Sequence, residues 1–312
     1  MPTESKDPNP LVSIILPVYN GARYVAEAIN SIFAQTCSDF EIVVVDGGST
    51  DNTLEIVNSF GDPRIVVVMQ PANSGRLPGA LNLGFANARG EFLTWFQDDD
   101  RYEPEALEVM LAFFDNHPDV DFVYADGWLI DEDDQLIRKI EVGPPEGLRE
   151  ANCVWHCFLY RSAVRDDVGQ YDVNTFLMED YDYWLRVLLS DHKMAVCPTS
   201  RPLHYHRFQP TALTSTYGVK ERCQVMHKVQ RKHLGDAALS AAKLTAQFHI
   251  GWAFASYFRG DLRNVRTYVP LAVRYDPTLL VNLGVLSIFT ESVIGSRLAS
   301  LLRRSARRIL GR

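Results

Sequence analysis

Three consecutive aspartates, Asp98, Asp99 and Asp100, stand directly after an apolar stretch of the sequence. Adjacent carboxylates repel one another, and this cost is relieved when they are solvated or when a cation neutralises them. Mg²⁺ and Mn²⁺ commonly bind one or two protein carboxylates together with substrate phosphates. We therefore predict a metal site with Asp99 as the first ligand and Asp98 beside it. Taken alone, such a run is more often a solvated loop or a helix cap.

A second polar cluster begins at Asp46, again after an apolar stretch. Asp46 can accept hydrogen bonds from a nucleotide base or ribose, and Gly47 and Gly48 allow the backbone to approach a ligand closely. Tyr19 follows an earlier apolar stretch that ends near Pro17, and its ring can stack on a base. An ordinary glycine turn followed by a helix cap is the alternative interpretation.

A third cluster contains Glu179, Asp180, Asp182 and Arg186. Helical spacing places Asp182 and Arg186 on neighbouring turns. A carboxylate at the start of a helix, such as Asp180, can take a proton from a hydroxyl group, and Arg186 can pair with a carboxylate or a phosphate. The alternative is a capped helix start with a surface pair between Asp182 and Arg186.

Alternating strands and helices must position these clusters, and the fold class that they indicate is α/β. Short apolar, β-branched runs predict strands, and apolar residues at helical spacing predict helices. The predicted strands are 11–17, 40–46, 64–69, 91–96 and 122–125, and the predicted helices are 23–35, 51–60, 79–88 and 104–116. Such alternation implies parallel pairing, and ligands bind beyond the carboxyl ends of parallel strands. The first two clusters fall at these ends.

The second half of the chain is less regular. A charged turn at 131–134 is expected to join a hairpin, and a Gly/Pro-rich stretch follows at 143–147. We predict a helix at 180–189, short strands at 193–197 and 203–208, and helices beyond residue 215. Asp261 can cap the second helix of a helical hairpin, which stops before Pro277.

The two ends of the chain differ in character. The segment 279–302 is apolar but contains Asn282, Glu291 and Arg297, so we do not expect it to span a membrane. A basic tail follows, consisting of Arg303, Arg304, Arg307, Arg308 and Arg312. Membrane-surface contact and core packing are alternatives for this region. The first ten residues are polar, lack the apolar centre of a secretory signal, and predict a flexible arm.

The composition limits the classes of function. A net charge of -8 disfavours nonspecific nucleic-acid binding. The 312 residues, of which 46% are hydrophobic, can form one large or two modest domains. Five scattered cysteines without a paired CxxC motif indicate reduced thiols and a cytoplasmic location. Cys153 and Cys157 flank His156, but no fourth zinc ligand is evident, so buried thiols are the better interpretation.

The three clusters, in this order, resemble the family 2 glycosyltransferases with the GT-A fold. The resemblance covers about residues 11–215 and begins with the opening pattern at 12–20. The family's nucleotide-binding acidic position falls on Asp46, and its metal-binding motif falls on 97–100. Its Asn-x-Gly and Ala-x-Asn-x-Gly stretches fall on 73–75 and 80–84. Its Glu-Asp motif falls on Glu179 and Asp180, before Trp184, Leu185 and Arg186.

The resemblance implies an inverting transfer with Asp180 as the base, supported by Glu179 and Arg186, and Mg²⁺ or Mn²⁺ as the cofactor. The implied nucleotide-sugar contacts are Pro17, Tyr19, Asp46, Asn73, Arg76, Asn82, Asp98 and Arg207. Trp155 and Trp184 can stack on the acceptor, although buried packing is the commoner use of such rings. The acceptor pocket is expected to involve 153–160 and the segment after Arg207.

Three positions depart from the family pattern. Gly47 replaces a second aspartate, so Asp46 must recognise the nucleotide alone. Gln97 stands at the first aspartate position of the metal motif, which leaves most of the metal binding to Asp99. Gln209 stands where a histidine is expected, and His206 or His204 is the alternative ligand; a core or surface role for these histidines is equally compatible with the sequence.

The expected fold is therefore a GT-A type, Rossmann-like mixed sheet flanked by helices, with a C-terminal helical extension. The expected parts are a flexible arm at 1–10, a catalytic domain at 11–215 with nucleotide-sugar and acceptor halves meeting at 126/127, and a helical region with a basic tail at 216–312. The expected function is sugar transfer from a UDP-sugar or related donor to a saccharide or lipid-linked saccharide hydroxyl, in polysaccharide or glycolipid synthesis. The expected location is cytoplasmic, with the inner face of the membrane as an open alternative. A metal-dependent nucleotidyltransferase and a noncatalytic nucleotide-sugar-binding protein remain the rival hypotheses.

Overall fold

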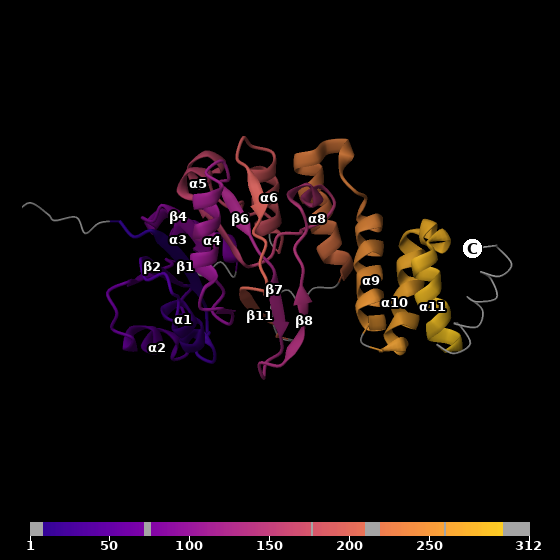
Figure 1. Cartoon of the computed structure of the whole chain (residues 1–312), viewed down its shortest axis with the longest axis horizontal. Coiled ribbons are helices and arrows are strands. Elements are labelled where there is room, and N and C mark those ends of the chain that lie inside the picture. Colours follow the sequence, from indigo (N-terminus) through magenta and orange to yellow (C-terminus); the bar gives the residue numbers. More distant parts are fainter. Residues whose placement is uncertain (1–8, 72–75, 176, 210–218, 259, 296–312) are drawn as a thin grey trace, which may run out of the picture. The chain divides into compact units, whose positions relative to one another are not determined.

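The computed structural model describes residues 9–71, 76–175, 177–209, 219–258 and 260–295, and Figure 1 shows the course of the chain. The chain divides into two compact units, residues 1–216 and 217–312. The predicted flexible arm lies almost wholly outside the described residues, as does the predicted basic tail.

The N-terminal unit is built on a seven-stranded mixed sheet with the strand order β10-β6-β9-β4-β1-β2-β3. Its strands are β1 (Val12–Val18), β2 (Phe40–Asp46), β3 (Ile65–Met69), β4 (Phe92–Trp95), β6 (Phe122–Tyr124), β9 (Phe158–Arg161) and β10 (Met194–Val196). The pairs among β3, β2, β1 and β4 are parallel, as the alternation of strands and helices predicted. The exception is β9, which runs antiparallel between β4 and β6.

The helices of this unit are α1 (Val25–Phe33), α2 (Thr53–Ser59), α3 (Leu77–Asn87), α4 (Ala106–Asn116), α5 (Ser162–Val168) and α6 (Glu179–Leu188), with a 3-10 turn η1 (Pro145–Arg149). Every residue of β2 is buried, and the alternate side chains of β1 enter different packing layers. Ile14 and Leu16 join the main hydrophobic core, together with buried residues of α1 and α4. Ile15 instead faces α3, where a Cβ at Gly84 would lie only 2.4 Å from its Cγ2. Helices therefore cover both faces of the sheet, and Gly84 permits the close approach of α3.

A second sheet of the same unit has the order β5-β11-β7-β8. Its strands are β5 (Arg101–Tyr102), β7 (Gly127–Ile130), β8 (Leu136–Ile140) and β11 (His204–Arg207). The predicted charged turn joins β7 and β8 as an antiparallel hairpin, with Asp134 in the left-handed region at φ 63°. Because β11 pairs with β5 directly after the three aspartates, this sheet brings residues 204–207 against the acidic run.

The C-terminal unit is helical, as predicted. It contains α8 (Val219–Leu234), α9 (Ala241–Phe258), α10 (Leu262–Tyr275) and α11 (Leu283–Ile294), with 3-10 turns η2 (Gly235–Ala237) and η3 (Pro277–Val281). Asp261 caps α10, because its carboxylate accepts a hydrogen bond from the Asn264 backbone N–H. Within the described residues, no helix is sufficiently long and apolar to cross a membrane.

Candidate active site

Two loops at the carboxyl ends of β1 and β2 are joined by the side chain of Asn20. Its carbonyl oxygen accepts a hydrogen bond from the Thr50 backbone N–H at 2.8 Å, while its own backbone N–H donates to Ser49 Oγ at 3.0 Å. Asn20 has φ 53°, a left-handed conformation that asparagine tolerates better than most residues. The parallel pairing of β1 with both β2 and β4 places the loops that follow these three strands at one edge of the sheet.

Asp46 is fully buried at the end of β2 and organises the turn that follows. Its carboxylate accepts hydrogen bonds from the backbone N–H groups of Gly48 at 2.9 Å and Ser49 at 3.1 Å. Gly48 has φ 85°, a conformation that favours glycine. Tyr19 is 55% exposed and available for stacking, whereas Pro17 lies within β1, paired with Val45. Asp46 therefore shapes the loop after β2, and Tyr19 presents an open ring.

Asp98 and Asp99 form the acidic part of the site, two partly buried carboxylates in the loop after β4. Burial, followed by the charges of Asp99 and Asp100, raises the pKa of Asp98 to about 7. Burial and the charge of Asp100 raise the pKa of Asp99 to about 6. A Cβ at Gly21 would lie 2.0 Å from Asp98 Oδ2, so this loop closes tightly over the carboxylate. A bound cation would offset the energetic cost of burying these two carboxylates and the repulsion between them.

Asp100 has a different role, because it is completely buried beneath the other two aspartates. His206 Nδ1 and His204 Nε2 each lie 3.1 Å from its carboxylate, and the Arg207 backbone N–H donates to it at 3.0 Å. Burial alone would raise the pKa of Asp100, but His206 and His204 hold it well below its usual range. Asp100 therefore fastens β11 to the acidic loop.

The predicted third metal ligand is not assembled around Asp99. His206 is directed at Asp100, and the Gln209 side-chain amide donates a hydrogen bond to Asp99 Oδ2. Among the residues that the structure describes, no group of three His, Cys, Asp or Glu side chains could hold a metal ion. Asp98 and Asp99 instead fit the mode in which one or two carboxylates hold Mg²⁺ or Mn²⁺ together with phosphate oxygens of a ligand.

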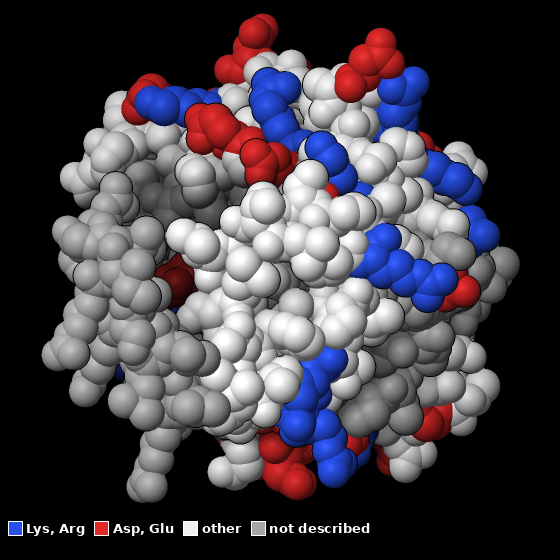
Figure 2. Space-filling model, turned by 90° about the vertical axis from the view of Figure 1, so that its right-hand side faces the viewer, with Lys and Arg blue, Asp and Glu red and all other residues white. Residues whose placement is uncertain are grey.

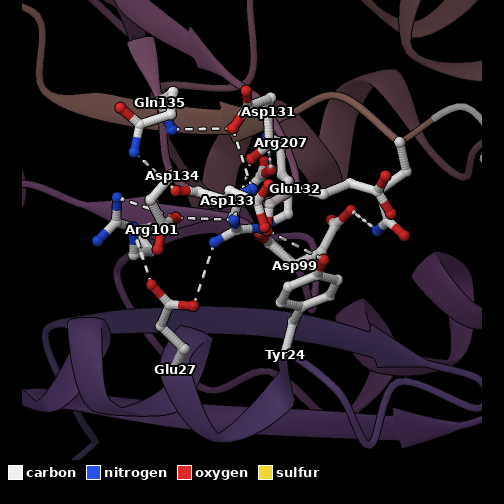
Figure 3. A network of polar contacts seen from close by, with 12 residues as sticks. Tyr24, Glu27, Asp99, Arg101, Asp131, Glu132, Asp133, Asp134, Gln135 and Arg207 are labelled. Carbon is white, nitrogen blue, oxygen red and sulfur yellow. Dashed lines mark hydrogen bonds and ion pairs between the residues drawn. The ribbon is translucent and has the colours of Figure 1, made fainter.

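Arg207 fixes the backbone of the acidic loop (Figure 3). Its side chain is only 1% exposed. Its guanidinium donates to the carbonyl oxygen of Asp99 at 3.0 Å, to that of Asp131 at 3.2 Å and to the Asp134 carboxylate at 2.7 Å. The β7–β8 turn and the acidic loop are therefore held by one buried cation, and the donors of Arg207 are engaged inside the protein. This placement gives Arg207, predicted as a nucleotide contact, a set of partners within the protein.

The same cation also holds helix α1. Arg207 donates to Glu27 at 3.1 Å, and its guanidinium lies 4.4 Å from the ring centre of Tyr24. Arg101 pairs with Glu27 at 3.0 Å and with Asp134 at 3.3 Å. Figure 3 shows these side chains converging from α1 and the β7–β8 turn. Two arginines thus share two carboxylates, but Arg207 alone of this pair reaches the backbone of Asp99.

Glu179 and Asp180 are the first two residues of α6. Leu177, two residues before the helix, has a φ of 70°, which marks a strained turn. Asp180 accepts hydrogen bonds from the Asn152 side-chain amide at 2.8 Å and from the Tyr181 backbone N–H at 2.7 Å. Burial raises the pKa of Asp180, and these two hydrogen bonds oppose that rise. Burial and the charge of Asp180 raise the pKa of Glu179 to about 7. Glu179 is therefore able to exchange a proton near neutral pH, directly beside the Asp180 carboxyl.

Replacing Asn152 with alanine should move the acidic limb of the pH–activity profile to higher pH by about one unit. A hydrogen bond to a charged group contributes about 1.5–3 kcal/mol, and its loss leaves the Asp180 carboxylate harder to ionise. The measurement is the pH dependence of kcat/KM. Asn152→Ser, which can still donate, should stay closer to the parent. A profile that keeps its position in Asn152→Ala would show that this hydrogen bond does not tune Asp180.

Three other predicted site residues have structural partners. Arg186 donates to Asp182 at 3.0 Å and to the carbonyl oxygens of Val168 and Gln170, so its guanidinium supports α6. Trp184 is 1% exposed, which places its ring in the aromatic core and not against an acceptor. The Asn82 side-chain amide donates one hydrogen bond to the Tyr171 carbonyl oxygen at 2.9 Å and accepts one from the Tyr171 backbone N–H at 2.8 Å.

The remaining predicted residues divide between the site and its surroundings. Trp155 is partly exposed and packs edge-on against His206, with ring centres 5.3 Å apart. Its indole N–H is buried without a hydrogen-bond partner among the described residues. Arg76 donates to the carbonyl oxygen of Val173 at 3.2 Å. Asn73 lies outside the described residues.

The segment 152–156 links the two acidic sites. Its first residue, Asn152, donates to Asp180, and its last, His156, makes a 3.0 Å hydrogen bond with Gln97 beside the three aspartates. Four residues of extended chain span at most about 14 Å, so the two acidic sites lie at opposite ends of a short connection. The sequence predicted an acceptor pocket at 153–160 and raised zinc binding at Cys153, His156 and Cys157. It gave no indication of Asn152, because an asparagine in a loop carries no local signal of its partner.

Comparison with known proteins matches most of the N-terminal unit. The family model for "Glycosyl transferase family 2" matches residues 13–169. A protein of Rickettsia typhi named as an uncharacterized glycosyltransferase is 34% identical over 191 residues, which cover 58% of this chain and 59% of that protein. A PGL/p-HBAD biosynthesis glycosyltransferase of Mycobacterium bovis is 31% identical over 191 residues, covering 57% and 69%. The chain thus spans less than two thirds of the Rickettsia typhi relative.

Two solved structures share the fold. S. aureus TarS 1-349, in complex with UDP-GlcNAc, has a TM-score of 0.60 and 19% identity, covering 95% of this chain and 92% of that one. The mannosyltransferase PcManGT of Pyrobaculum calidifontis, in complex with GDP-Man and Mn²⁺, has a TM-score of 0.58 and 17% identity, covering 96% and 87%. The predicted GT-A type mixed sheet flanked by helices is confirmed.

Proposed function

This chain belongs to glycosyl transferase family 2, and from that membership we propose that it transfers a sugar from a nucleotide-diphosphate donor to a hydroxyl group. The observation that carries the proposal is the linked pair of acidic sites. Asp98 and Asp99 lie at the sheet edge where parallel α/β folds bind nucleotides, and segment 152–156 ties that edge to Asp180. One site can hold a diphosphate, and the other can accept a proton.

Asp180 is the proposed base. The acceptor hydroxyl gives its proton to the Asp180 carboxylate while its oxygen forms a bond to the anomeric carbon of the donor. The bond from that carbon to the diphosphate oxygen breaks on the opposite side, so the configuration inverts. Asn152 orients Asp180 and favours its ionised form, and the neighbouring Glu179 can hold a proton near neutral pH.

Asp99 and Asp98 are the proposed protein ligands for Mg²⁺ or Mn²⁺, with the donor phosphates supplying further oxygens. A cation bound there offsets the charge that develops on the departing diphosphate. Tyr19, exposed at the end of β1, is proposed to stack on the base of the donor. UDP-sugars are the first donors to test, and the UDP-GlcNAc and GDP-Man complexes of the structural relatives support including both nucleotides.

The test is a panel of UDP- and GDP-sugars with Mn²⁺ or Mg²⁺, read by release of nucleoside diphosphate. Metal-dependent release from one donor class supports the proposal. Release of pyrophosphate from a nucleoside triphosphate would favour a nucleotidyltransferase instead. Donor binding without turnover, with any of these metals and a range of saccharide acceptors, would favour a noncatalytic binding protein.

Asp99→Asn should lower metal-stimulated donor turnover about 100-fold, because one of two carboxylates that neutralise the cation is lost. Asp98→Asn should have a smaller effect. Titration with Mn²⁺ at a fixed donor concentration should show a weaker apparent affinity in both variants. Asp133→Asn, at an exposed position of the β7–β8 turn, is the control. Equal metal responses in Asp99→Asn and in this control would remove Asp99 from the metal site.

The proposed acceptor is a saccharide or lipid-linked saccharide in polysaccharide or glycolipid synthesis at the cell surface. The name of the Mycobacterium bovis relative, which refers to PGL/p-HBAD biosynthesis, supports this class. Trp155 supports a saccharide acceptor as well, since its ring is partly exposed and its buried N–H has no partner among the described residues. We propose a cytoplasmic location with access to lipid-linked acceptors.

A further inference from the structure

The two units of the chain carry opposite charge. Residues 217–312 contain 16 Lys and Arg against 5 Asp and Glu, a formal charge of +11. Residues 1–216 contain 15 Lys and Arg against 34 Asp and Glu, a formal charge of -19. A strong charge asymmetry of this kind indicates a binding partner for the basic part that differs from the ligand of the acidic part.

Helix α11 is apolar on two sides, which is unusual for a helix at the surface. Val285, Ile288 and Ser292 form its buried side. The opposite side presents Leu283, which is 82% exposed, followed by Leu286 and Val293 at helical spacing. Its single charged residue, Glu291, accepts a hydrogen bond from the Tyr257 hydroxyl at 2.9 Å. The exposed side of α11 therefore carries no charged residue.

The preceding turn η3 extends this surface. Leu280 is 56% exposed and Val281 is 80% exposed, directly before α11. Between α10, η3 and α11 lies an open pocket of about 220 Å³ whose lining is wholly apolar and includes Val273, Leu279 and Phe289. Exposed aliphatic side chains beside an apolar pocket form a surface that water solvates poorly.

Helix α10 supplies the charge. Its exposed positions Arg263, Arg266 and Arg274 recur at helical spacing along one side, while Val265, Val269 and Ala272 form its buried side. Figure 2 shows a broad uncharged area on the face turned to the viewer, with Lys and Arg side chains along its edges and Asp and Glu mainly at the upper and lower margins.

We propose that η3 and α11 dock the C-terminal unit on a bilayer that contains anionic lipid. Leu280, Val281 and Leu283 enter the region between headgroups and acyl chains, the apolar pocket takes part of an acyl chain, and the α10 arginines contact lipid phosphates. Pairing of two C-terminal units through this surface is less favourable, because two units of charge +11 repel each other. A soluble polyanion would leave the exposed aliphatic side chains unexplained. The proposal does not depend on the proposed activity.

The test is cosedimentation of the full chain with vesicles of phosphatidylcholine, with and without phosphatidylglycerol. The parent should bind the phosphatidylglycerol vesicles more tightly. Val281→Glu combined with Leu283→Glu should weaken this binding by about tenfold or more. Replacing Arg263, Arg266 and Arg274 with glutamine should weaken it by about 100-fold. Leu136→Glu, at an exposed position of β8 in the other unit, should bind like the parent.

Several outcomes would overturn the proposal. The first is that the parent does not bind vesicles. The second is that the Val281→Glu/Leu283→Glu protein binds vesicles like the parent. The third is that sedimentation velocity shows a parent dimer, which this double substitution dissociates without changing vesicle binding. A polyanion site would be indicated by two results together. The variant without the three α10 arginines would lose vesicle binding and polyphosphate binding equally, and the Val281→Glu/Leu283→Glu variant would keep both kinds of binding. Both replaced aliphatic residues are at least 80% exposed, so folding should persist, and circular dichroism checks this. Val281→Ser/Leu283→Ser provides a second, uncharged variant.

Discussion

Replacing Asp180 with asparagine should lower the rate of sugar transfer about 10³-fold and leave donor binding nearly unchanged. Asparagine keeps the shape of the side chain but cannot take a proton from the acceptor hydroxyl, and positioned bases contribute factors of about this size. The substitution should be tolerated by the fold. Asn152 has an amide oxygen without a partner among the described residues, so turning that amide would let it accept a hydrogen bond from the new amide at position 180.

The measurement is single-turnover transfer to a saccharide acceptor, with the dissociation constant of the nucleotide sugar determined separately. Asp191→Asn makes the same change of charge at an exposed position after α6 and should behave like the parent. Transfer within a few fold of the parent at saturating donor would contradict the assignment of Asp180 as the base. A loss that appears only as weaker donor binding would instead place Asp180 among the donor contacts.

Arg207→Met should lower the free energy of unfolding of the N-terminal unit by about 3 kcal/mol, the second large effect that the structure predicts. Methionine has comparable length but no donors, so the carbonyl oxygens of Asp99 and Asp131 would lose their hydrogen bonds. The carboxylates of Glu27 and Asp134 would also lose a buried cation, and breaking a buried ion pair is strongly destabilising.

Denaturant titration of the full chain measures the effect, and Arg101→Met is the matched control. Arg101 pairs with the same two carboxylates, Glu27 and Asp134, but its side chain is more exposed than that of Arg207. Its loss should cost about 1 kcal/mol or less. Arg207→Lys should fall between, because one ammonium group cannot reach all the acceptors that the planar guanidinium joins. Equal costs for Arg207→Met and Arg101→Met would show that burial does not set the importance of Arg207.

Arg207 should also influence the metal. Because its guanidinium holds the backbone of Asp99, Arg207→Met should weaken the apparent affinity for Mn²⁺ more than Arg101→Met does. This comparison separates the two roles, since a purely structural arginine would change stability without moving the metal titration.

The first half of the fold was predictable from local patterns. The strands β1 and β2 are short runs rich in β-branched residues and are buried almost throughout, and β2 occupies the predicted residues 40–46. Burial on two faces produces continuous apolar stretches that stand out in sequence, and the intervening helices show the spacing of one apolar face. The three acidic clusters were also identified correctly as features that end strands or begin a helix.

The pairing of β9 was not predictable in the same way. Phe158–Arg161 is a four-residue strand whose sequence does not reveal that it enters between β4 and β6 in the opposite direction. Its place follows from the return of the chain across the sheet after the β7–β8 hairpin. Local patterns report whether a segment is buried, and they do not report its neighbours.

The same distinction governs the site. The sequence by itself determined the family resemblance, the run Asp98 to Asp100, and the acidic start of α6. Only the tertiary structure gave the three aspartates different roles. His204, His206 and the Arg207 backbone N–H, more than a hundred residues away in sequence, bind the Asp100 carboxylate. Asp98 and Asp99 remain partly exposed. Tertiary contacts of the same kind engage Arg207 and form the Asp182–Arg186 pair and the buried packing of Trp184, which were the alternative interpretations of the last two residues. A side chain's chemistry depends on the partners that folding supplies, and those partners come from elements whose proximity no local spacing encodes.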